Sequence, residues 1–189
     1  MNPLIFLDIE TNGIDPSVHQ IIEIACVKWQ DGKVLETFES LVNPRSLLPY
    51  EITLLTGITD AELKNAPLFP EIKPRVLDFI GDLPIVGHNI AFDISFLRSH
   101  HCEIKNPEVD TVALARILLL REPSYALEVL MKKYKLPVKP SHRAMVDVET
   151  TISFFEFLTE KIRKIPKPVL EQMKNVLKKS AWAGKTLFA

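Results

Sequence analysis

The feature that most constrains the fold is an apolar strand that carries two acids near its end. The run Leu-Ile-Phe-Leu-Asp-Ile over 4–9 is followed at once by Glu10. Residues two apart on a strand point the same way, so Asp8 and Glu10 project together. On a buried strand, desolvation and mutual repulsion oppose the charged forms unless a cation is present. The alternative is a strand that has reached the surface, where the acids begin a polar turn continued by Asn12-Gly13, and these residues alone favour neither interpretation.

The order of the predicted elements indicates one mixed α/β domain. Strands are expected first, over 4–9, 21–29 and 34–42. The turn-forming pair Asp31-Gly32 separates the last two strands, and the Pro- and Thr-rich segment 43–70 is expected to be a long functional loop with short helical turns. Helices are then expected over 72–80, 89–101, 112–120, 125–134, 143–165 and 169–177, and short strands over 83–87 and 109–111. This order predicts a three-layer α/β fold.

Length and composition fit a single substantial core. The chain has 189 residues, of which 47% are hydrophobic. No run approaches the roughly 18 apolar residues of a membrane span, and the first residues lack the basic flank and cleavage site of a signal peptide. We therefore expect a soluble, cytoplasmic protein with no membrane partner. Cys26 and Cys102 are not at paired metal-ligand spacing, so reduced thiols are expected rather than a disulfide or a zinc site.

Charge is nearly balanced overall but unevenly spread. The net charge is −1, so any contact with nucleic acid must be local. Residues 161–189 hold eight Lys or Arg and one acid, which gives +7, whereas the rest of the chain carries −8. A basic tail that touches nucleic acid and a solvated helix face or linker both explain this excess, and the second is slightly favoured.

A third acid lies where a predicted strand meets a predicted helix. Asp93 ends the stretch Gly-His-Asn-Ile-Ala-Phe-Asp over 87–93, in the first turn of the helix. The helix dipole favours an acid there, so an isolated Asp needs no other explanation. The same junction lies at the sheet edge where sites in α/β folds are usually built, which makes Asp93 a candidate member of a ligand set.

A histidine and a fourth acid lie near the start of the longest predicted helix. His142 and Asp147 belong to the stretch Ser-His-Arg-Ala-Met-Val-Asp over 141–147. Five positions on one helix would place them about 140° apart, so they converge only if His142 precedes the helix and Asp147 lies in its first turns. Pro140 supports a start near His142, because proline disfavours helix at the residue before it. Alone, His142 is more typical of an exposed loop histidine than of a catalyst.

Together these residues match the needs of phosphodiester hydrolysis. Oxygen ligands suit hard divalent ions, and the four acids Asp8, Glu10, Asp93 and Asp147 supply them. His142 adds a base of the type that titrates near pH 7. Zinc is not favoured, because Cys and His do not occur at suitable spacing.

The same residues give a resemblance to a known family. The order Asp8-x-Glu10, Asp93 and His142-x-x-x-x-Asp147 resembles the DEDDh 3′–5′ exonucleases, a branch of the ribonuclease-H-like superfamily that includes the proofreading epsilon subunit of bacterial DNA polymerase III. The resemblance covers about residues 3–160. Further matching stretches are Leu-Thr-Gly-Ile-Thr over 55–59, Ala66-Pro67, Asp110-Thr111 and Leu-Ala-Arg over 114–116.

The resemblance implies a ribonuclease-H-like three-layer fold with a five-stranded mixed sheet flanked by helices. Because Pro166 and Pro168 break the chain after the last long helix, we expect the exonuclease domain over 1–165 and a basic C-terminal helix and tail over 166–189. The four acids would hold two Mg²⁺ or Mn²⁺ ions, and His142 would take the proton from the attacking water, so that nucleoside 5′-monophosphates leave the single-stranded 3′ end of DNA. Residues 54–58 would pack against the terminal base. The substrate-binding residues implied are Thr11, Thr56, Asn89 and Phe92.

The biological role has several candidates. Proofreading or repair of DNA is expected, although proofreading subunits often carry histidine where Thr56 stands. The stretch Ser180-Ala181-Trp182 resembles the connector that joins this nuclease domain to helicases or other modules, so a polymerase and a helicase are both candidate partners. An RNA-trimming exonuclease shares the same motifs. A non-catalytic nucleic-acid-binding subunit is the alternative of another class, but such members should lose metal ligands, and all four acids and His142 are present here.

Overall fold

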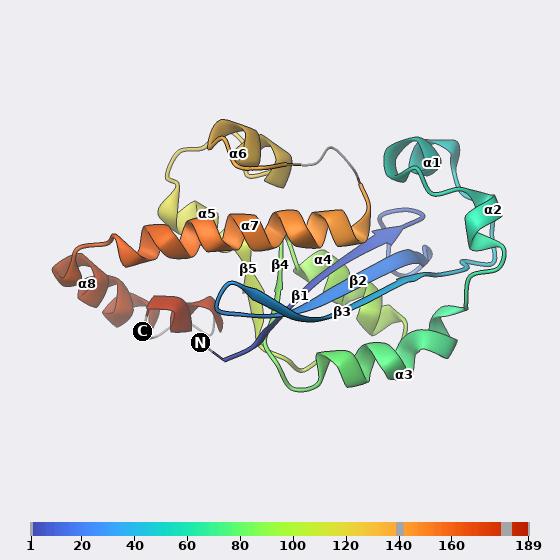
Figure 1. Ribbon diagram of the computed structural model, residues 1–189, viewed down its shortest axis with the longest axis horizontal. Coiled ribbons are helices and arrows are strands. Elements are labelled where there is room, and N and C mark those ends of the chain that lie inside the picture. Colours follow the sequence, from blue (N-terminus) through green and yellow to red (C-terminus); the bar gives the residue numbers. More distant parts are fainter. Residues whose placement is uncertain (1, 139–141, 179–182, 189) are drawn as a thin grey trace.

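A five-stranded mixed sheet forms the centre of the computed structural model, which describes residues 2–138, 142–178 and 183–188. The antiparallel part consists of β1 (Leu4–Thr11), β2 (Ile21–Gln30) and β3 (Lys33–Leu41). The parallel part adds β4 (Ile85–Gly87) and β5 (Glu108–Asp110) beyond β1. The order across the sheet is β3-β2-β1-β4-β5 (Figure 1), which confirms the predicted mixed sheet.

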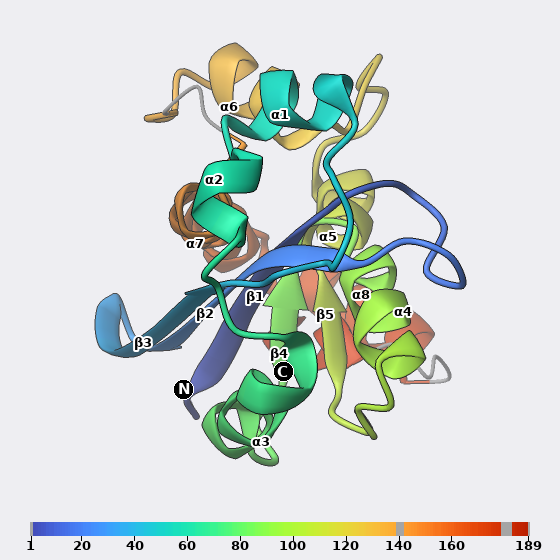
Figure 2. The same cartoon turned by 90° about the vertical axis from the view of Figure 1, so that its right-hand side faces the viewer.

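Helices cover both faces of this sheet, as expected for three layers. One face packs against α3 (Phe69–Ile80) and α4 (Ala91–Ser99). The other packs against α5 (Thr111–Leu118), α6 (Leu127–Lys133) and α7 (Ala144–Arg163). Figure 2 looks along the layers and shows α3 and α4 on the opposite side of the sheet from α7. Burial from both sides explains why β1 is apolar at consecutive positions rather than at alternate ones.

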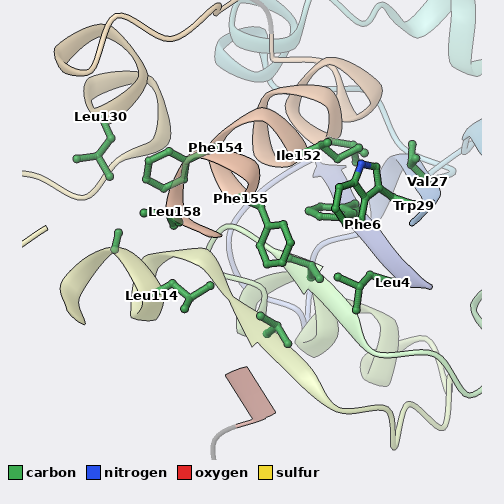
Figure 3. Packing of buried hydrophobic residues seen from close by; sticks show 14 of the residues in the cluster. Leu4, Phe6, Val27, Trp29, Leu114, Leu130, Ile152, Phe154, Phe155 and Leu158 are labelled. Atoms are coloured by element: carbon green, nitrogen blue, oxygen red, sulfur yellow. The ribbon is translucent and has the colours of Figure 1, made fainter. Parts of the chain in front are cut away.

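The core between α7 and the sheet is built around three aromatic rings. Phe6 of β1, Trp29 of β2 and Phe155 of α7 meet edge to face, with ring centroids 5.3, 5.8 and 5.9 Å apart (Figure 3). Aromatic pairs in this geometry contribute about 0.5–1.5 kcal/mol beyond the area that they bury. The rings therefore fix the position of α7 over the half of β1 that precedes the acids.

The connection between β3 and α3 contains two short helices where short helical turns are predicted. α1 (Tyr50–Thr56) ends at Gly57, whose φ of 72° closes the helix in the left-handed conformation that glycine tolerates. α2 (Asp60–Leu63) begins with a capping box in which Thr59 and Glu62 satisfy each other's backbone N–H groups.

The helix α3 begins at Phe69, earlier than the predicted start at residue 72. Pro70 fits the first turn of a helix, where its missing N–H has no partner to lose. The carboxylate of Glu71 accepts a hydrogen bond from the Leu68 N–H at 2.7 Å and caps the end. The apolar period alone does not reveal these polar starting residues.

The C-terminal residues return to the body of the protein. α8 (Lys167–Leu177) follows the C-terminal end of α7, and the short 3-10 helix η1 (Ala183–Phe188) packs against β5, with Phe188 fully buried. In Figure 1, α8 and α1 lie beyond opposite ends of α7. The helix predicted over 169–177 is confirmed as α8. The sequence does not predict η1.

The boundary between domains at residues 165 and 166 stays a prediction. The stretch Ser180-Ala181-Trp182 lies outside the described residues. Among the helices of the described residues, none combines the length and the hydrophobicity needed to cross a membrane. Cys26 and Cys102 are both buried as free thiols.

Candidate active site

The two acids of β1 continue the face that packs against α7. Phe6 belongs to the core under α7, and the two-residue period of the strand brings Asp8 and Glu10 to the same side. Glu10 lies directly opposite Glu23 in the antiparallel register with β2. The strand continues through the buried Thr11. Asp8 and Glu10 are therefore half-buried members of a strand and do not begin a surface turn.

The start of α7 brings a third carboxylate to the same place. The helix begins at Ala144, so His142 precedes it and Asp147 lies in its first turn, as the sequence predicts. Carboxylate oxygens of Asp8, Glu10 and Asp147 all lie within 4.8 Å of one another. Ligand oxygens lie roughly 2.0–2.6 Å from Mg²⁺ or Ca²⁺, so two ligands of one ion are at most about 5 Å apart. The three carboxylates therefore fit a hard divalent cation.

Asp93 approaches these acids from α4, on the other side of β1. Its side chain is buried, and its Oδ1 accepts a hydrogen bond from the backbone N–H of Ile9 at 3.0 Å. That bond ties the first turn of α4 to β1 between the two acids of the strand. We call Asp8, Glu10, Asp93 and Asp147 the acid cluster.

The pKa values of the four carboxyl groups in the acid cluster are all raised. Burial, followed by the charges of Asp93 and Asp147, raises the pKa of Asp8 well above its ordinary value. Burial is also the main cause that raises the pKa of Glu10 to about 8 and that of Asp93 to about 8. Burial raises the pKa of Asp147 to about 6, and the charge of His142 opposes that rise. A divalent cation would reverse these shifts, because it favours the charged form of every ligand.

An open cavity of about 490 Å³ adjoins the acid cluster. Asp8, Asp147 and His142 line it together with Leu55 of α1. The start of α6 forms a second wall of the cavity, which we call the α6 wall and which consists of Ala126, Leu127 and Glu128. A charged edge beside apolar surface suits a ligand that has both a phosphate and a flat ring, and the volume lies in the range of small-molecule sites. Leu55 belongs to the stretch 54–58 that is predicted to pack against a base.

His88 holds this α6 wall to the sheet, a role that the sequence does not reveal. Burial lowers the pKa of His88, which favours the neutral ring. The carbonyl of Tyr125 can only accept, so Nε2 donates to it at 2.8 Å. Nδ1 lies 2.8 Å from the Thr111 hydroxyl, which donates to the Gly87 carbonyl at 3.1 Å. The bond to Tyr125 fixes the chain just before α6. The sequence carries no local signal for a bond between residues so far apart.

The four predicted substrate-binding residues lie in different environments. The Thr11 hydroxyl donates to the Gly13 carbonyl at 2.6 Å. The buried Thr56 hydroxyl donates to the Ile52 carbonyl of α1 at 2.9 Å and accepts from the Ile58 N–H just after the helix at 3.1 Å. Asn89 is exposed, with a positive φ of 66°, and Phe92 is half-buried. Their roles in binding stay predictions.

An ion pair between a buried carboxylate and a half-buried arginine, beside the acid cluster, is also absent from the sequence prediction. Glu23 of β2 has no exposed surface and pairs with Arg143, the residue that precedes α7, at 2.6 Å. In sequence, Glu23 is one polar residue inside an apolar strand, which by itself is typical of a strand position that faces solvent. Only the register of β2 against β1 places it opposite Glu10.

Comparison with known proteins agrees with this arrangement. Residues 5–155 match the model of the RNase_T family, described as exonuclease. The chain is 34% identical over 164 residues to a PolC-type DNA polymerase III of Clostridium perfringens, which covers 85% of this chain and 11% of that protein. It is 35% identical over 177 residues to a PolC-type DNA polymerase III of Thermotoga maritima, covering 91% and 13%. The chain thus spans about a tenth of the length of these relatives.

Solved structures of exonucleases share the fold. A structure titled exonuclease X in complex with 5′ overhanging duplex DNA has a TM-score of 0.70 at 24% identity, covering 98% of this chain and 99% of that chain. Exonuclease I of E. coli, in complex with a dT13 oligonucleotide, has a TM-score of 0.72 at 22% identity, covering 94% and 44%. At such identities the likeness establishes the ribonuclease-H-like fold alone. Because the family model matches most of the sequence, the chain belongs to the exonuclease family.

Proposed function

We propose that this chain is a 3′–5′ exonuclease that hydrolyses terminal phosphodiester bonds of DNA. The observation that carries the proposal is the meeting of three carboxylates within 4.8 Å, with His142 on the cavity beside them. The three acids come from β1 and α7, which are far apart in sequence, and Asp93 adds a fourth from α4. Burying like charges together costs free energy, so stability alone does not account for the cluster.

The acid cluster is proposed to hold two Mg²⁺ or Mn²⁺ ions. Carboxylate oxygens are the ligands that these ions prefer, and the spacing of Asp8, Glu10 and Asp147 fits them. When bound, the ions supply the positive charge that activates water and stabilises the leaving oxygen of the phosphodiester. The part of the protein is to hold the four carboxylates in place. The bond from Ile9 to Asp93 and the first turn of α7 do so.

His142 is proposed to act as the general base. It lies on the loop before α7 and lines the same cavity as Asp8 and Asp147. In its neutral form the imidazole accepts the proton of the attacking water, and the negative charge of Asp147 stabilises the imidazolium that results. Attack on the terminal phosphodiester then releases a nucleoside 5′-monophosphate.

The cavity is proposed to bind the terminal nucleotide. Leu55 and Leu127 offer apolar surface to the base from two sides, and the acid cluster lies where the phosphate would be. His88 keeps the α6 wall in place through its bond to the Tyr125 carbonyl.

DNA is the favoured substrate because of the relatives. Two relatives in sequence are named PolC-type DNA polymerase III. Two structures with the same fold are titled as complexes with DNA or with a dT13 oligonucleotide. We propose that the chain acts in proofreading or repair, beside a polymerase or a helicase.

A digestion series tests direction and substrate together. Single-stranded DNA labelled at the 3′ or the 5′ end, duplex DNA with a matched or a mismatched 3′ terminus, and RNA are incubated with the protein and Mg²⁺. The proposal expects 5′-mononucleotides released from the 3′ end of single-stranded DNA and of the mismatched duplex. Faster digestion of RNA would identify an RNA-trimming enzyme instead, and binding without digestion in any metal would identify a non-catalytic subunit.

A further inference from the structure

We propose that Glu23 and Arg143 are positioning residues, which fix the start of α7 and so hold His142 and Asp147 at the acid cluster. Their effect on rate rests on the proposed exonuclease function, whereas their effect on the helix start does not. Glu23 is a carboxylate without exposed surface near the start of β2. A buried charge of this kind is costly unless its partners compensate it, so those partners matter.

Both oxygens of Glu23 accept hydrogen bonds from the residues that begin α7. Oε1 accepts from Nε and Nη2 of Arg143 at 2.9 and 2.6 Å. Oε2 accepts from the same Nε at 3.2 Å and from the backbone N–H of Ala144 at 2.8 Å. The planar guanidinium fork makes two bonds in one fixed orientation, which an ammonium group does not reproduce. Glu23 and Arg143 form what we call the strand-to-helix clamp.

The bond to Ala144 serves as a helix cap that comes from another element. The first N–H groups of a helix have no partners inside it. Arg143 occupies the N-cap position with an extended backbone, and its own side chain makes no capping bond. Glu23 satisfies the first N–H instead and places negative charge at the positive end of the helix.

The strand-to-helix clamp holds both residues of α7 that the mechanism needs. His142 is bonded to Arg143 through the chain, and the Arg143 carbonyl accepts the hydrogen bond from the Asp147 N–H at 3.0 Å. Glu23 in turn lies opposite Glu10 on the neighbouring strand. The separation between the acids of β1 and the residues of α7 is therefore set through β2.

Glu23 places a further carboxylate beside the acid cluster, and the positive charge of Arg143 compensates it. Burial is the main cause of the raised pKa of Glu10, Glu23 adds to it, and Arg143 opposes it. An apolar pair at these positions would fill the space but would leave the Ala144 N–H unpaired. The charge, the fork and the cap thus act together on the first turn of α7.

The test uses Glu23→Gln, Arg143→Lys and a matched control, Arg98→Lys. Arg98 forms an exposed ion pair with Glu108 at 2.8 Å, away from the acid cluster. At saturating single-stranded DNA and Mg²⁺, we expect the single-turnover rate of both clamp variants to fall about 10- to 100-fold, as for losses that misorient a metal site. The KM for DNA should change by less than about threefold, because the cavity walls are untouched. Arg98→Lys should match the unchanged protein.

Amide hydrogen exchange over 144–148, measured without DNA or metal, gives a readout that does not depend on activity. Exchange should accelerate about 10-fold or more in both clamp variants and not in the control, because each change weakens the charge-assisted bonds that hold the helix start. Accelerated exchange in a protein that never digests nucleic acid would overturn the exonuclease function and leave the clamp standing. Unchanged rates in an active enzyme would overturn the positioning role, whether or not exchange accelerates. If Glu23→Gln fails to fold, Arg143→Lys keeps the charge and decides the question.

Discussion

The contact between β1 and α7 changes character along its length. In one half, Phe6 packs edge to face on Phe155, with ring centroids 5.3 Å apart. In the other half, Asp8 and Glu10 of the same strand face Asp147 of the same helix. Buried apolar surface stabilises the folded state by itself. Buried like charges destabilise it until a cation binds.

Within this one contact, the aromatic half stabilises the fold and the acidic half supplies the chemistry. The aromatic half holds α7 on the sheet, so that the acidic half stays assembled despite its repulsion. Each half should therefore respond to substitution in its own way. Loss of an acid should remove activity and spare the fold, whereas loss of an aromatic ring should weaken the fold and spare the chemistry of what remains folded.

The largest effect is expected from removing an acid. Asp8→Ala or Asp147→Ala should abolish cleavage, a loss greater than the roughly 100-fold that an outer-shell partner of a metal costs. The free energy of unfolding without metal should not fall, because each change removes a buried repulsion. Initial digestion rates and urea denaturation measure the two quantities. Asp78→Ala, an exposed acid of α3, is the control, and full hydrolysis in excess EDTA would contradict the metal mechanism.

The next effect is expected from His142→Ala. The four acids remain, so Mn²⁺ and DNA should still bind, while the chemical step slows by about 10²- to 10⁴-fold, the usual contribution of a positioned base. The rate should rise less steeply with pH in the variant than in the unchanged enzyme, because a general base acts only in its deprotonated form. Single-turnover rates across pH measure this. His101→Asn is the control at an exposed histidine, and an unchanged rate in His142→Ala would remove His142 from the mechanism.

In the aromatic half, Phe155→Ala should lower the free energy of unfolding by about 3–5 kcal/mol, because it leaves a cavity among packed rings. The protein that remains folded should keep the rate constant of the chemical step and its dependence on metal. Phe157→Ala, two residues along the same helix and only half-buried, should cost less. A loss of rate in Phe155→Ala at a temperature where it is fully folded would show that the two halves are not separable.

The sequence predicts the sheet and the meeting of three acids, because both follow from local patterns. Asp8 and Glu10 stand out through the two-residue period of an apolar strand, and Asp147 through a histidine and a proline before a helix. The role of Glu23 cannot be predicted from local sequence, because it depends on which residue of β1 lies opposite. The position of the α6 wall cannot be predicted either, since a bond from His88 to a distant carbonyl fixes it.

The shifted carboxyl groups predict how stability without metal depends on pH. Their pKa values are raised in the folded protein, to about 8 for Glu10 and Asp93 and about 6 for Asp147, from 3.8 or 4.5. Between these values the folded state binds more protons than the unfolded state, so the free energy of unfolding falls as pH rises. The stabilisation is complete below about pH 4 and is lost as pH rises to about 8.

Thermal unfolding in EDTA from pH 4 to pH 8 checks this trend. The Tm should fall across the range, and Mg²⁺ should raise it more at pH 8 than at pH 5, because a bound cation compensates the charges. Asp8→Asn should flatten the decline. A Tm that rises steadily to pH 8 in EDTA would contradict the raised pKa values of the acid cluster.

The smallest effect is expected at the basic end of the molecule. α8 follows the C-terminal end of α7, and the 20 residues of α7 span about 30 Å, whereas Asp147 lies in the first turn. Basic side chains there are too far from the acid cluster to touch a terminal phosphate.

Deletion is a poor test, because Phe188 is buried and its loss would open the core. Replacing the exposed Lys164, Lys167 and Lys178 by Gln removes charge without that damage. We expect an unchanged rate on a dinucleotide and an unchanged salt dependence for a long single strand. If these lysines do bind the strand, removing each bond to a phosphate should reduce the slope of log K against log salt by about 0.7, so a slope lower by about 2 would assign the basic excess to nucleic acid rather than to a solvated helix face.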